Sequence, residues 1–342
     1  MLPVPPAVIV TDAATTGIAG AVRVPATSGS FRRTGPPVVP IAADPALYGA
    51  SDGAGNTAFG AFVQWEWMSD ASQLDLLVLK YNAVFDLFVD GQPVQAGAFA
   101  TPATGDRRLV KLDWSADADP RRPRHYRLAG TNLLFGGLYL DAAGSAWAPG
   151  DRAGAGLLAV LGDSYTQGTG ALSAARNWVA AAAAQLQMDG WSDGIGGSGW
   201  NSPGSNAPVA RIGRGIAVLT RAPDIVVTAL GYNDAAVDAA GVQRLRASYD
   251  ATIAAIRAAW PGARLVSLGP WTPLGPTGGL GTVRAAIAER AAAAGVRFVD
   301  LEGMIGAGNR ALYTGTDSVH PTPQGHVYLG RRIGQAIAAA MA

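Results

Sequence analysis

The sequence predicts two domains of different class: an all-β sandwich of jelly-roll type over residues 1–150 and an α/β domain over residues 151–342. A chain of 342 residues suits about two domains of ~150 residues each. Before residue 150, short apolar runs alternate with turn residues and no helical period stands out, which is typical of sandwiches and jelly rolls. After it, strand-like and helix-like runs alternate, which predicts a parallel sheet covered by helices on both faces.

In the first domain, residues 1–45 are rich in Pro, Gly, Thr and Ala, so we expect short strands and loops there. The pattern sharpens at Phe59, and Trp65 and Trp67 then alternate with polar residues, which is the period of a strand. These tryptophans predict a sandwich core, with a sugar-stacking face as the alternative. Asp90-Gly91 predicts a tight hairpin, because both central positions of such a turn need positive φ. The expected strands cover residues 63–67, 74–79, 84–89, 109–114, 126–128 and 133–140.

The second domain follows an expected linker at residues 141–156. Its clearest helix covers residues 242–260, where apolar side chains recur at steps of three and four. Further helices are expected at residues 178–188, 283–293 and 326–341. Short apolar runs predict buried strands at residues 157–161, 225–227, 265–268 and 296–299.

The composition excludes several classes of function. The net charge is +1, and Arg121, Arg122 and Arg124 are expected to form a solvated loop, so nucleic acid is not an expected partner. The absence of cysteine excludes disulfides, thiol nucleophiles and thiolate metal sites. No apolar run approaches the ~20 residues that span a bilayer, so no membrane partner is expected. Residues 1–6 lack the features of a signal peptide, but a trimmed chain would look the same, so the sequence leaves the compartment open: secreted or periplasmic if a signal peptide was removed, otherwise cytoplasmic.

Ser164 is the candidate nucleophile. It stands in Gly162-Asp163-Ser164-Tyr165, directly after the apolar run at residues 157–161 that predicts a buried strand. Ligands of open α/β sheets bind outside the carboxyl ends of the strands, which is where this serine is expected. It can act as a nucleophile only if a base and an oxyanion site converge on it.

His320 is the candidate base among three histidines. His125 lies in the predicted sandwich and His326 in the closing helix, so we expect packing, capping or solvated positions for these two. His320 follows Asp317 by three residues, which brings the carboxylate within reach of the imidazole. Asp317 can then accept the Nδ1–H and leave Nε2 facing Ser164.

Two segments offer donors for an oxyanion. Asn233, in Gly231-Tyr232-Asn233-Asp234, follows a buried strand, so its amide is expected at the same sheet edge as Ser164. Residues 194–199 are rich in glycine, which leaves their N–H groups unobstructed. This run fits G-x-G-x-x-G, but a loop follows it instead of a helix, so we reject a dinucleotide site. The sequence also lacks a G-x-S-x-G elbow, a Walker A motif and a zincin helix.

Taken together, these segments resemble the four blocks of the SGNH (GDSL-like) hydrolase superfamily over residues 155–342. In chain order the blocks are Gly162-Asp163-Ser164, Gly199, Gly231-Tyr232-Asn233-Asp234 and Asp317-Ser318-Val319-His320. Tyr165 departs from the leucine of the family's common name. The resemblance implies a flavodoxin-like three-layer α/β/α domain that hydrolyses esters and needs neither a metal nor an organic cofactor.

The resemblance also implies the role of each site residue. Ser164 would be the nucleophile, His320 the base and Asp317 the group that orients the base. The oxyanion hole would consist of the N–H groups of Ser164 and Gly199 and the side chain of Asn233, with Gly197 as the alternative to Gly199.

The order of the domains resembles that of bacterial carbohydrate acetylesterases in which a β-sandwich precedes the SGNH domain. This likeness implies removal of acetyl groups from a polysaccharide or oligosaccharide. Trp200, Tyr232 and Trp271 follow segments expected near the site, where they would form a sugar platform or the wall of an acyl pocket, or simply pack.

We therefore expect a serine esterase that acts on short-chain acyl esters, acetyl esters first, of a carbohydrate or a small molecule. One alternative is a carbohydrate-binding protein whose second domain is inactive. Others use the same serine as an O-acetyltransferase or as a lipid or thioester hydrolase. The sequence does not specify an oligomeric state.

Overall fold

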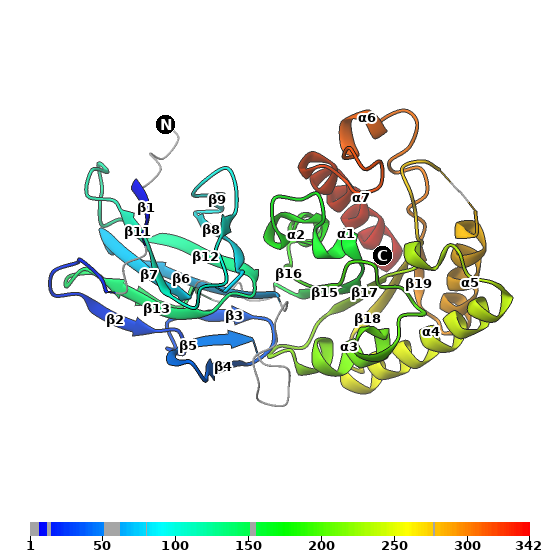
Figure 1. Ribbon diagram of the computed structural model, residues 1–342, viewed down its shortest axis with the longest axis horizontal. Helices are drawn as coiled ribbons and strands as arrows, with labels where there is room; N and C mark the ends of the chain where they lie inside the picture. Colours follow the sequence, from blue (N-terminus) through cyan, green and yellow to red (C-terminus); the bar gives the residue numbers. More distant parts are fainter. Residues whose placement is uncertain (1–6, 12–14, 51–61, 80, 151–154, 276–277) are drawn as a thin grey trace. The chain divides into compact units, whose positions relative to one another are not determined.

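The computed structural model describes residues 7–11, 15–50, 62–79, 81–150, 155–275 and 278–342. The chain divides into two compact units, Met1–Gly154 and Ala155–Ala342 (Figure 1). The expected boundary between residues 150 and 151 adjoins residues 151–154, which lie outside the described residues, as does Phe59.

The first unit is a β-sandwich of two antiparallel sheets. Its strands are β1 (Ala7–Thr11), β2 (Val22–Pro25), β3 (Arg32–Thr34), β4 (Val38–Ile41), β5 (Asp44–Ala50), β6 (Phe62–Ser69), β7 (Gln73–Leu79), β8 (Val84–Val89), β9 (Gln92–Pro93), β10 (Phe99–Ala100), β11 (Arg107–Asp113), β12 (Arg124–Thr131), β13 (Phe135–Leu140) and β14 (Ala146–Trp147). One sheet has the order β1-β11-β7-β13-β5-β4, with β2 beside β13. The other has the order β10-β8-β12-β6-β14, with β3 beside β6 and β9 beside β8.

The aromatic residues of β6 lie in the sandwich core, as the alternation predicts. Trp65 and Trp67 are fully buried, and the ring of Trp67 stacks on Tyr126 of the neighbouring strand with 5.2 Å between centroids. The Asp90-Gly91 hairpin is also confirmed, because both residues have positive φ, 50° and 79°, between β8 and β9. The alternation of apolar side chains and the Asp90-Gly91 turn therefore predicted strands β6 and β8 and the hairpin after β8 correctly.

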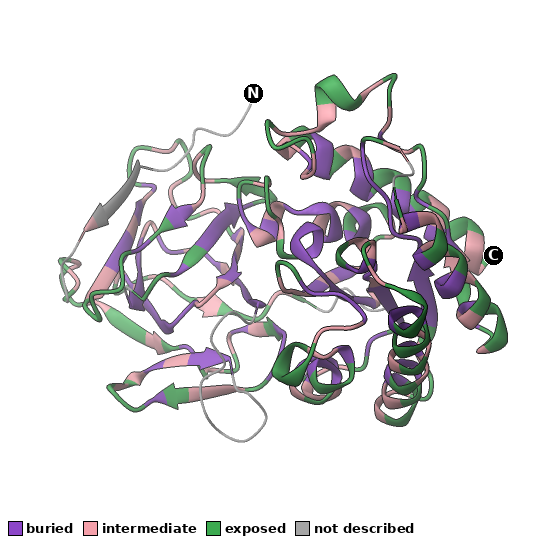
Figure 2. Ribbon diagram, turned by 45° about the vertical axis from the view of Figure 1, so that its right-hand side comes forward, coloured by how far each residue is buried: buried purple, intermediate pink, exposed green. Residues whose placement is uncertain are grey.

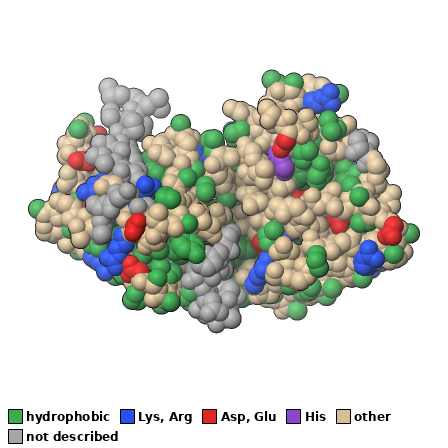
Figure 3. Space-filling model, in the orientation of Figure 1, with side chains coloured by type: hydrophobic (Ala, Val, Ile, Leu, Met, Phe, Trp, Pro, Cys, Tyr) green, Lys and Arg blue, Asp and Glu red, His purple; other side chains and the backbone are tan. Residues whose placement is uncertain are grey.

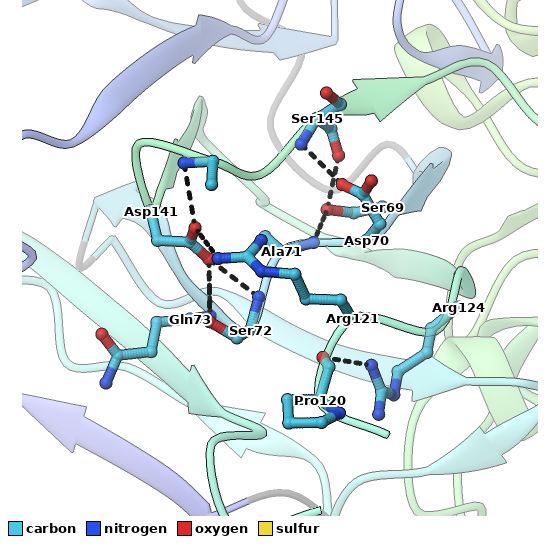
Figure 4. Close-up of polar contacts among 11 residues, drawn as sticks. Ser69, Asp70, Ala71, Ser72, Gln73, Pro120, Arg121, Arg124, Asp141 and Ser145 are labelled. Carbon is cyan, nitrogen blue, oxygen red and sulfur yellow. Dashed lines mark hydrogen bonds and ion pairs between the residues drawn. The ribbon is translucent and has the colours of Figure 1, made fainter.

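The expectation of a solvated arginine loop is wrong for Arg124. Its side chain is fully buried, and its guanidinium lies 4.0 Å from the centre of the Trp114 ring. It donates to the carbonyl oxygen of Pro120 (Figure 4). It also donates to the carbonyl oxygens of Asp119 and Arg122 and to the carboxylate of Asp117. A guanidinium can be buried when its donors find acceptors in this way.

Asp141 anchors the end of β13. Its carboxylate accepts hydrogen bonds from the backbone N–H groups of Ser72, Gln73 and Ala143 and from the guanidinium of Arg121 (Figure 4). Burial raises the pKa of this carboxyl, but Arg121 and the N–H donors outweigh that effect and hold the pKa at about 2. The last long strand of the sandwich is therefore tied to the start of β7.

The second unit is a parallel sheet covered on both faces by helices. Its strands are β15 (Leu157–Gly162), β16 (Asp189–Gly194), β17 (Ile225–Ala229), β18 (Arg264–Leu268) and β19 (Arg297–Val299). Its α-helices are α1 (Ser164–Gln167), α2 (Trp178–Gln185), α3 (Pro208–Arg214), α4 (Ala239–Ala259), α5 (Leu280–Ala293), α6 (Arg310–Tyr313) and α7 (Pro323–Met341). Short 3-10 helices lie at Ala174–Arg176, Gly204–Asn206, Ile216–Val218 and Tyr232–Asp234. The sheet order β16-β15-β17-β18-β19 is the flavodoxin-like order, 2-1-3-4-5 in chain order.

The strand interiors of this sheet are buried, as Figure 2 shows. Helices α2 and α7 pack together over one face, and α3, α4 and α5 cover the other (Figure 1). The sequence did not predict β16, α1 or α3, and α2 ends at Gln185, before the expected residue 188. Among the described residues β16 is an edge strand beside β15, and its two carboxylates, Asp189 and Asp193, pair with Arg221 and Arg211. No helix among the described residues is long and apolar enough to span a membrane.

We predict opposite effects of alanine at two helical glycines. A Cβ at Gly330 of α7 would overlap the carbonyl oxygen of Trp178 and the Cβ of Ala181 in α2, whereas a Cβ at Gly281 of α5 meets nothing within 4 Å. Gly330→Ala should therefore destabilise the protein by about 1–3 kcal/mol, and Gly281→Ala should stabilise it by up to about 1 kcal/mol. Calorimetry of the full-length variants measures this as a lower and a higher Tm respectively. Equal Tm values would contradict the close helix contact.

Candidate active site

The candidate site lies where the strand order of the parallel sheet reverses. β15 is flanked by β16 and β17, so the loops that leave β15 and β17 run to opposite faces and open a crevice at their carboxyl ends. Ser164 follows β15 directly and Asn233 follows β17. Asp163 caps α1 by accepting the backbone N–H of Tyr165 at 3.0 Å. The local fold therefore places a hydroxyl and an amide at one sheet edge.

A continuous chain of hydrogen bonds joins Asp317, His320 and Ser164. The Nε2 atom of His320 lies 2.8 Å from the Oγ of Ser164, and its Nδ1 lies 2.6 Å from the Oδ2 of Asp317. The other carboxylate oxygen of Asp317 accepts the backbone N–H groups of Val319 and His320, both at 2.9 Å. The hydrogen bond from His320 and the two N–H groups lower the pKa of Asp317 to about 2, so this carboxylate is ionised at neutral pH.

The loop that carries His320 is held in place from two sides. The N–H of Gly315 donates to the carbonyl oxygen of His320 at 2.7 Å, which closes the loop on itself. The hydroxyl of Tyr165 donates to the carbonyl oxygen of Val319 at 3.2 Å, which ties the loop to the residue after Ser164. The imidazole thus keeps its position although 20% of the side chain is exposed.

The structure places Asn233 beside the glycine-rich turn. Its Nδ2 donates to the carbonyl oxygen of Ser198 at 2.8 Å, which uses one of its two hydrogens and leaves the second for another acceptor. Gly197 in the same turn is exposed with a φ of 74°, and its N–H has no acceptor among the described residues. The Cα of neighbouring Gly196 lies near Ser164, because a Cβ built there would be 3.9 Å from the Cβ of that serine.

The expectation that Gly199 supplies an oxyanion donor is not supported. Gly199 is buried, and its N–H already donates to the Oγ of Ser202 at 2.8 Å. A Cβ at this position would overlap the carboxylate of Asp234, which accepts the N–H groups of Trp200 and Asn201. The close approach of the Asp234 carboxylate therefore explains why position 199 is a glycine. Gly197, the alternative donor to the oxyanion, has an N–H without an acceptor among the described residues.

Arg211 of α3 anchors the turn, and nothing in the sequence singled it out. Its guanidinium is fully buried and donates to the carbonyl oxygen of Gly162 at 2.8 Å, to the Oγ of Ser198 at 3.0 Å and to the carboxylate of Asp193 at 3.0 Å. The end of β15, the end of β16 and the glycine-rich turn therefore share one cation. A lone arginine in a short helix carries no sequence signal for such a role.

The other histidines do not reach the hydroxyl of Ser164. His125 lies in the first unit, with Nε2 3.8 Å from the carboxylate of Glu66. His326 is fully buried in α7, where Nδ1 accepts the N–H of Trp178 at 3.2 Å and Nε2 lies 2.9 Å from the carbonyl oxygen of Thr169. This pairing requires the neutral imidazole with the hydrogen on Nε2. Burial lowers the pKa of His326 to about 4.

Of the three aromatic residues expected to bind substrate, two contact the same tyrosine ring and the third packs elsewhere. Tyr232 and Trp271 both contact the ring of Tyr165, at centroid distances of 5.6 and 5.0 Å. The expectation for Trp200 is not supported, because its side chain is 1% exposed and packs on Tyr249 of α4 at 4.9 Å. Within the described part of the chain, no group of three or more His, Asp or Glu side chains could hold a metal ion.

Comparisons with known proteins identify the class. Residues 160–328 match the model of the GDSL-like Lipase/Acylhydrolase family. No curated protein sequence matches the chain. The second unit therefore carries a domain of this family, and the protein is an SGNH-type ester hydrolase.

Solved structures extend the likeness to both units. A family two carbohydrate esterase from Clostridium thermocellum, solved with cellohexaose, has a TM-score of 0.68 at 18% identity and covers 94% of this chain and 99% of its own. An acetyl xylan esterase from Butyrivibrio proteoclasticus has a TM-score of 0.66 at 15% identity over 92% and 97%. The salicylyl-acyltransferase SsfX3 from a tetracycline biosynthetic pathway has a TM-score of 0.70 at 17% identity over 95% and 98%. The chain thus has the two-domain fold of family two carbohydrate esterases, a β-sandwich before an SGNH domain.

We predict that His326 makes the second unit less stable in mild acid. Between pH 6.5 and pH 4 the unfolded chain binds a proton at His326 and the folded chain does not, so stability falls as the pH falls through this range. His326→Gln lacks this titration, so the difference in unfolding free energy between wild type and variant should shrink by roughly 3 kcal/mol from pH 7 to pH 4. Hydrogen exchange of α2 and α7 amides measures it. A difference that stays constant with pH would show that this imidazole takes up a proton in the folded state as readily as in the unfolded chain.

Proposed function

We propose that the protein is a serine esterase that hydrolyses short-chain acyl esters, acetyl esters first, of carbohydrates. The observation that carries this proposal is the continuous chain of hydrogen bonds from Asp317 through His320 to Ser164. A serine hydroxyl is a weak nucleophile by itself, and a neutral imidazole at 2.8 Å can accept its proton during attack.

The reaction proceeds in two halves. Ser164 attacks the ester carbonyl carbon while His320 Nε2 takes the hydroxyl proton, and His320 then returns this proton to the leaving alcohol oxygen as the acyl–oxygen bond breaks. Water attacks the resulting acyl-serine with the same base, which releases the acid and restores the hydroxyl. Asp317 remains ionised throughout, because its pKa is about 2, and stabilises the imidazolium that forms in each half.

Three donors would stabilise the oxyanion: the N–H of Ser164, the N–H of Gly197 and the second Nδ2 hydrogen of Asn233. The backbone N–H of Ser164, like that of Gly197, has no acceptor among the residues that the structure describes. Such donors are already oriented before the reaction, so they cost no reorganisation when charge develops on the carbonyl oxygen.

The carbohydrate part of the proposal is supported by the structural neighbours. The solved structures include an acetyl xylan esterase and an esterase with bound cellohexaose. A salicylyl-acyltransferase has the same fold. We favour hydrolysis, because the side chains of His320 and Asp317 are 20% and 50% exposed, which leaves water access to the acyl-enzyme.

The three members of the hydrogen-bonded chain should differ in their effect on turnover of p-nitrophenyl acetate. Ser164→Ala and His320→Ala remove the nucleophile and the base and should each lower kcat by about 10⁴-fold or more. Asp317→Asn removes only the group that orients the base and should lower kcat by about 10²–10⁴-fold. Steady-state kinetics on the full-length variants measure these values.

A near-wild-type rate in Ser164→Ala would overturn the esterase proposal. Glycan binding by the wild type without any ester hydrolysis would favour the carbohydrate-binding alternative. Product analysis with a competing alcohol separates hydrolysis from transfer, because a transferase forms the new ester in preference to free acid.

The oxyanion donors can be tested separately. Asn233→Ala should lower kcat by about 10²–10³-fold with little change in KM, because the bond forms mainly in the transition state. Asn206→Ala, which changes an exposed asparagine of a nearby 3-10 helix, should leave kcat unchanged. A crystal structure of the phosphonylated enzyme should place the phosphoryl oxygen about 2.7–3.1 Å from the N atom of Gly197. An oxygen bound to the N–H of Gly199 instead would reverse the assignment.

A further inference from the structure

A small cavity in the second unit lies beside Tyr165, the residue that follows Ser164. Apolar side chains from α2, β18, the segment after β19 and α7 line it, and its empty volume including its opening is about 400 Å³. These side chains are Trp178, Leu268, Leu301, Leu329 and Ile333. Asp163 also lines it, and burial raises the pKa of this carboxyl to about 7. The esterase mechanism makes no use of this space.

The ring of Tyr165 contacts both the cavity and the group that faces Ser164. Its centroid lies 5.5 Å from the ring of His320, whose Nε2 contacts Ser164. The same ring lines the cavity together with Tyr232 and Trp271. Its side chain is 6% exposed, so the ring fills this position instead of projecting into solvent. Figure 3 shows hydrophobic side chains next to the exposed histidine and carboxylate on this unit.

The hydroxyl of Tyr165 keeps the ring in this position. It donates to the carbonyl oxygen of Val319 at 3.2 Å, while Trp271 and Tyr232 pack against the ring at 5.0 and 5.6 Å. Swinging the ring away would break this hydrogen bond and both aromatic contacts. A leucine at this position reaches less far and makes none of these contacts.

We propose that Tyr165 limits the length of the acyl group by closing the path from Ser164 to the apolar cavity. This inference rests on the proposed esterase function and deepens it. A short acyl group such as acetyl fits in front of the ring, and a longer straight chain collides with it. With the ring removed, the cavity would take the tail of a straight acyl chain, since each buried methylene contributes about 0.8 kcal/mol, or roughly fourfold.

The test compares p-nitrophenyl acetate, butyrate and hexanoate as substrates of the full-length protein. In Tyr165→Leu the ratio of kcat/KM for hexanoate to that for acetate should rise by about tenfold or more over wild type. Tyr165→Phe is the matched control, since it keeps the ring and loses only the hydroxyl. Its rates should fall by the same factor for all three esters, which leaves the ratio unchanged.

A second substitution that fills the cavity again tests the same proposal through the same ratio of kcat/KM values. Leu301 is 3% exposed and lines the cavity, so Leu301→Phe in the Tyr165→Leu background should return the ratio to the wild-type value. If Tyr165→Leu does not fold, as judged by the loss of its cooperative thermal transition, Tyr165→Met provides a longer apolar side chain with the same expected direction.

The outcomes separate the two proposals. Two results would overturn the role of Tyr165 and leave the esterase proposal intact. In the first, Tyr165→Leu hydrolyses acetate with the same hexanoate-to-acetate ratio of kcat/KM as wild type. In the second, the ratio rises in Tyr165→Leu and stays high after Leu301→Phe is added. A wild type that hydrolyses none of the three esters, or hydrolyses them equally well without Ser164, overturns both.

Discussion

The site depends on one buried cation. Arg211 ties the end of β15 through Gly162, the end of β16 through Asp193 and the glycine-rich turn through Ser198. A buried guanidinium without partners would cost several kcal/mol, so these acceptors must stay where they are as long as the protein is folded. Since Gly162 precedes Ser164 by two residues and Ser198 follows Gly197, the two halves of the proposed oxyanion site share one anchor.

Direct hydrogen bonds, and not a buried charge, hold Asp317 beside His320, the proposed base. The side chain of Asp317 is 50% exposed, so a low-dielectric environment cannot explain its pKa of about 2. Direct hydrogen bonds from the imidazole and from two backbone N–H groups lower it, because they favour the ionised form. Asp163 shows the reverse, because desolvation raises the pKa of this carboxyl more than its hydrogen bonds lower it. One carboxylate is thus suited to orient a base, while the other caps α1 and borders the cavity.

The sequence was most informative where one local rule decides the structure. Buried parallel strands are apolar throughout, so β15, β17 and β18 could be predicted, and with β15 the position of Ser164 at the sheet edge. The spacing of three residues predicted the contact between Asp317 and His320. Their convergence on Ser164 was expected mainly from the order of the blocks that resemble the SGNH superfamily. The edge strand β16 is polar and gave no such signal.

The misassigned residues share one cause, namely partners that are distant in sequence or hidden in local geometry. Trp200 is buried by Tyr249, which lies 49 positions further along the chain. Arg124 is buried because the carbonyl groups of a tight loop turn toward it and Trp114 covers it. Gly199 and Gly197 look alike in sequence, and only the positions of Ser202 and Asp234 show which N–H is free. Such facts depend on tertiary packing, which no local pattern contains.

Tyr165 contributes both to the position of the loop that carries His320 and, in our proposal, to the selection of the acyl group. Its hydroxyl holds the carbonyl group of the residue before His320, and its ring closes the apolar cavity. A smaller side chain would open the cavity and at the same time release the loop from this hydrogen bond, so a gain in chain length would come with a less rigidly held base. Phenylalanine would loosen the loop and keep the cavity closed. The hydroxyl of Tyr165 therefore holds the loop and its ring sets the acyl selectivity. Phenylalanine changes only the first property, whereas leucine changes both.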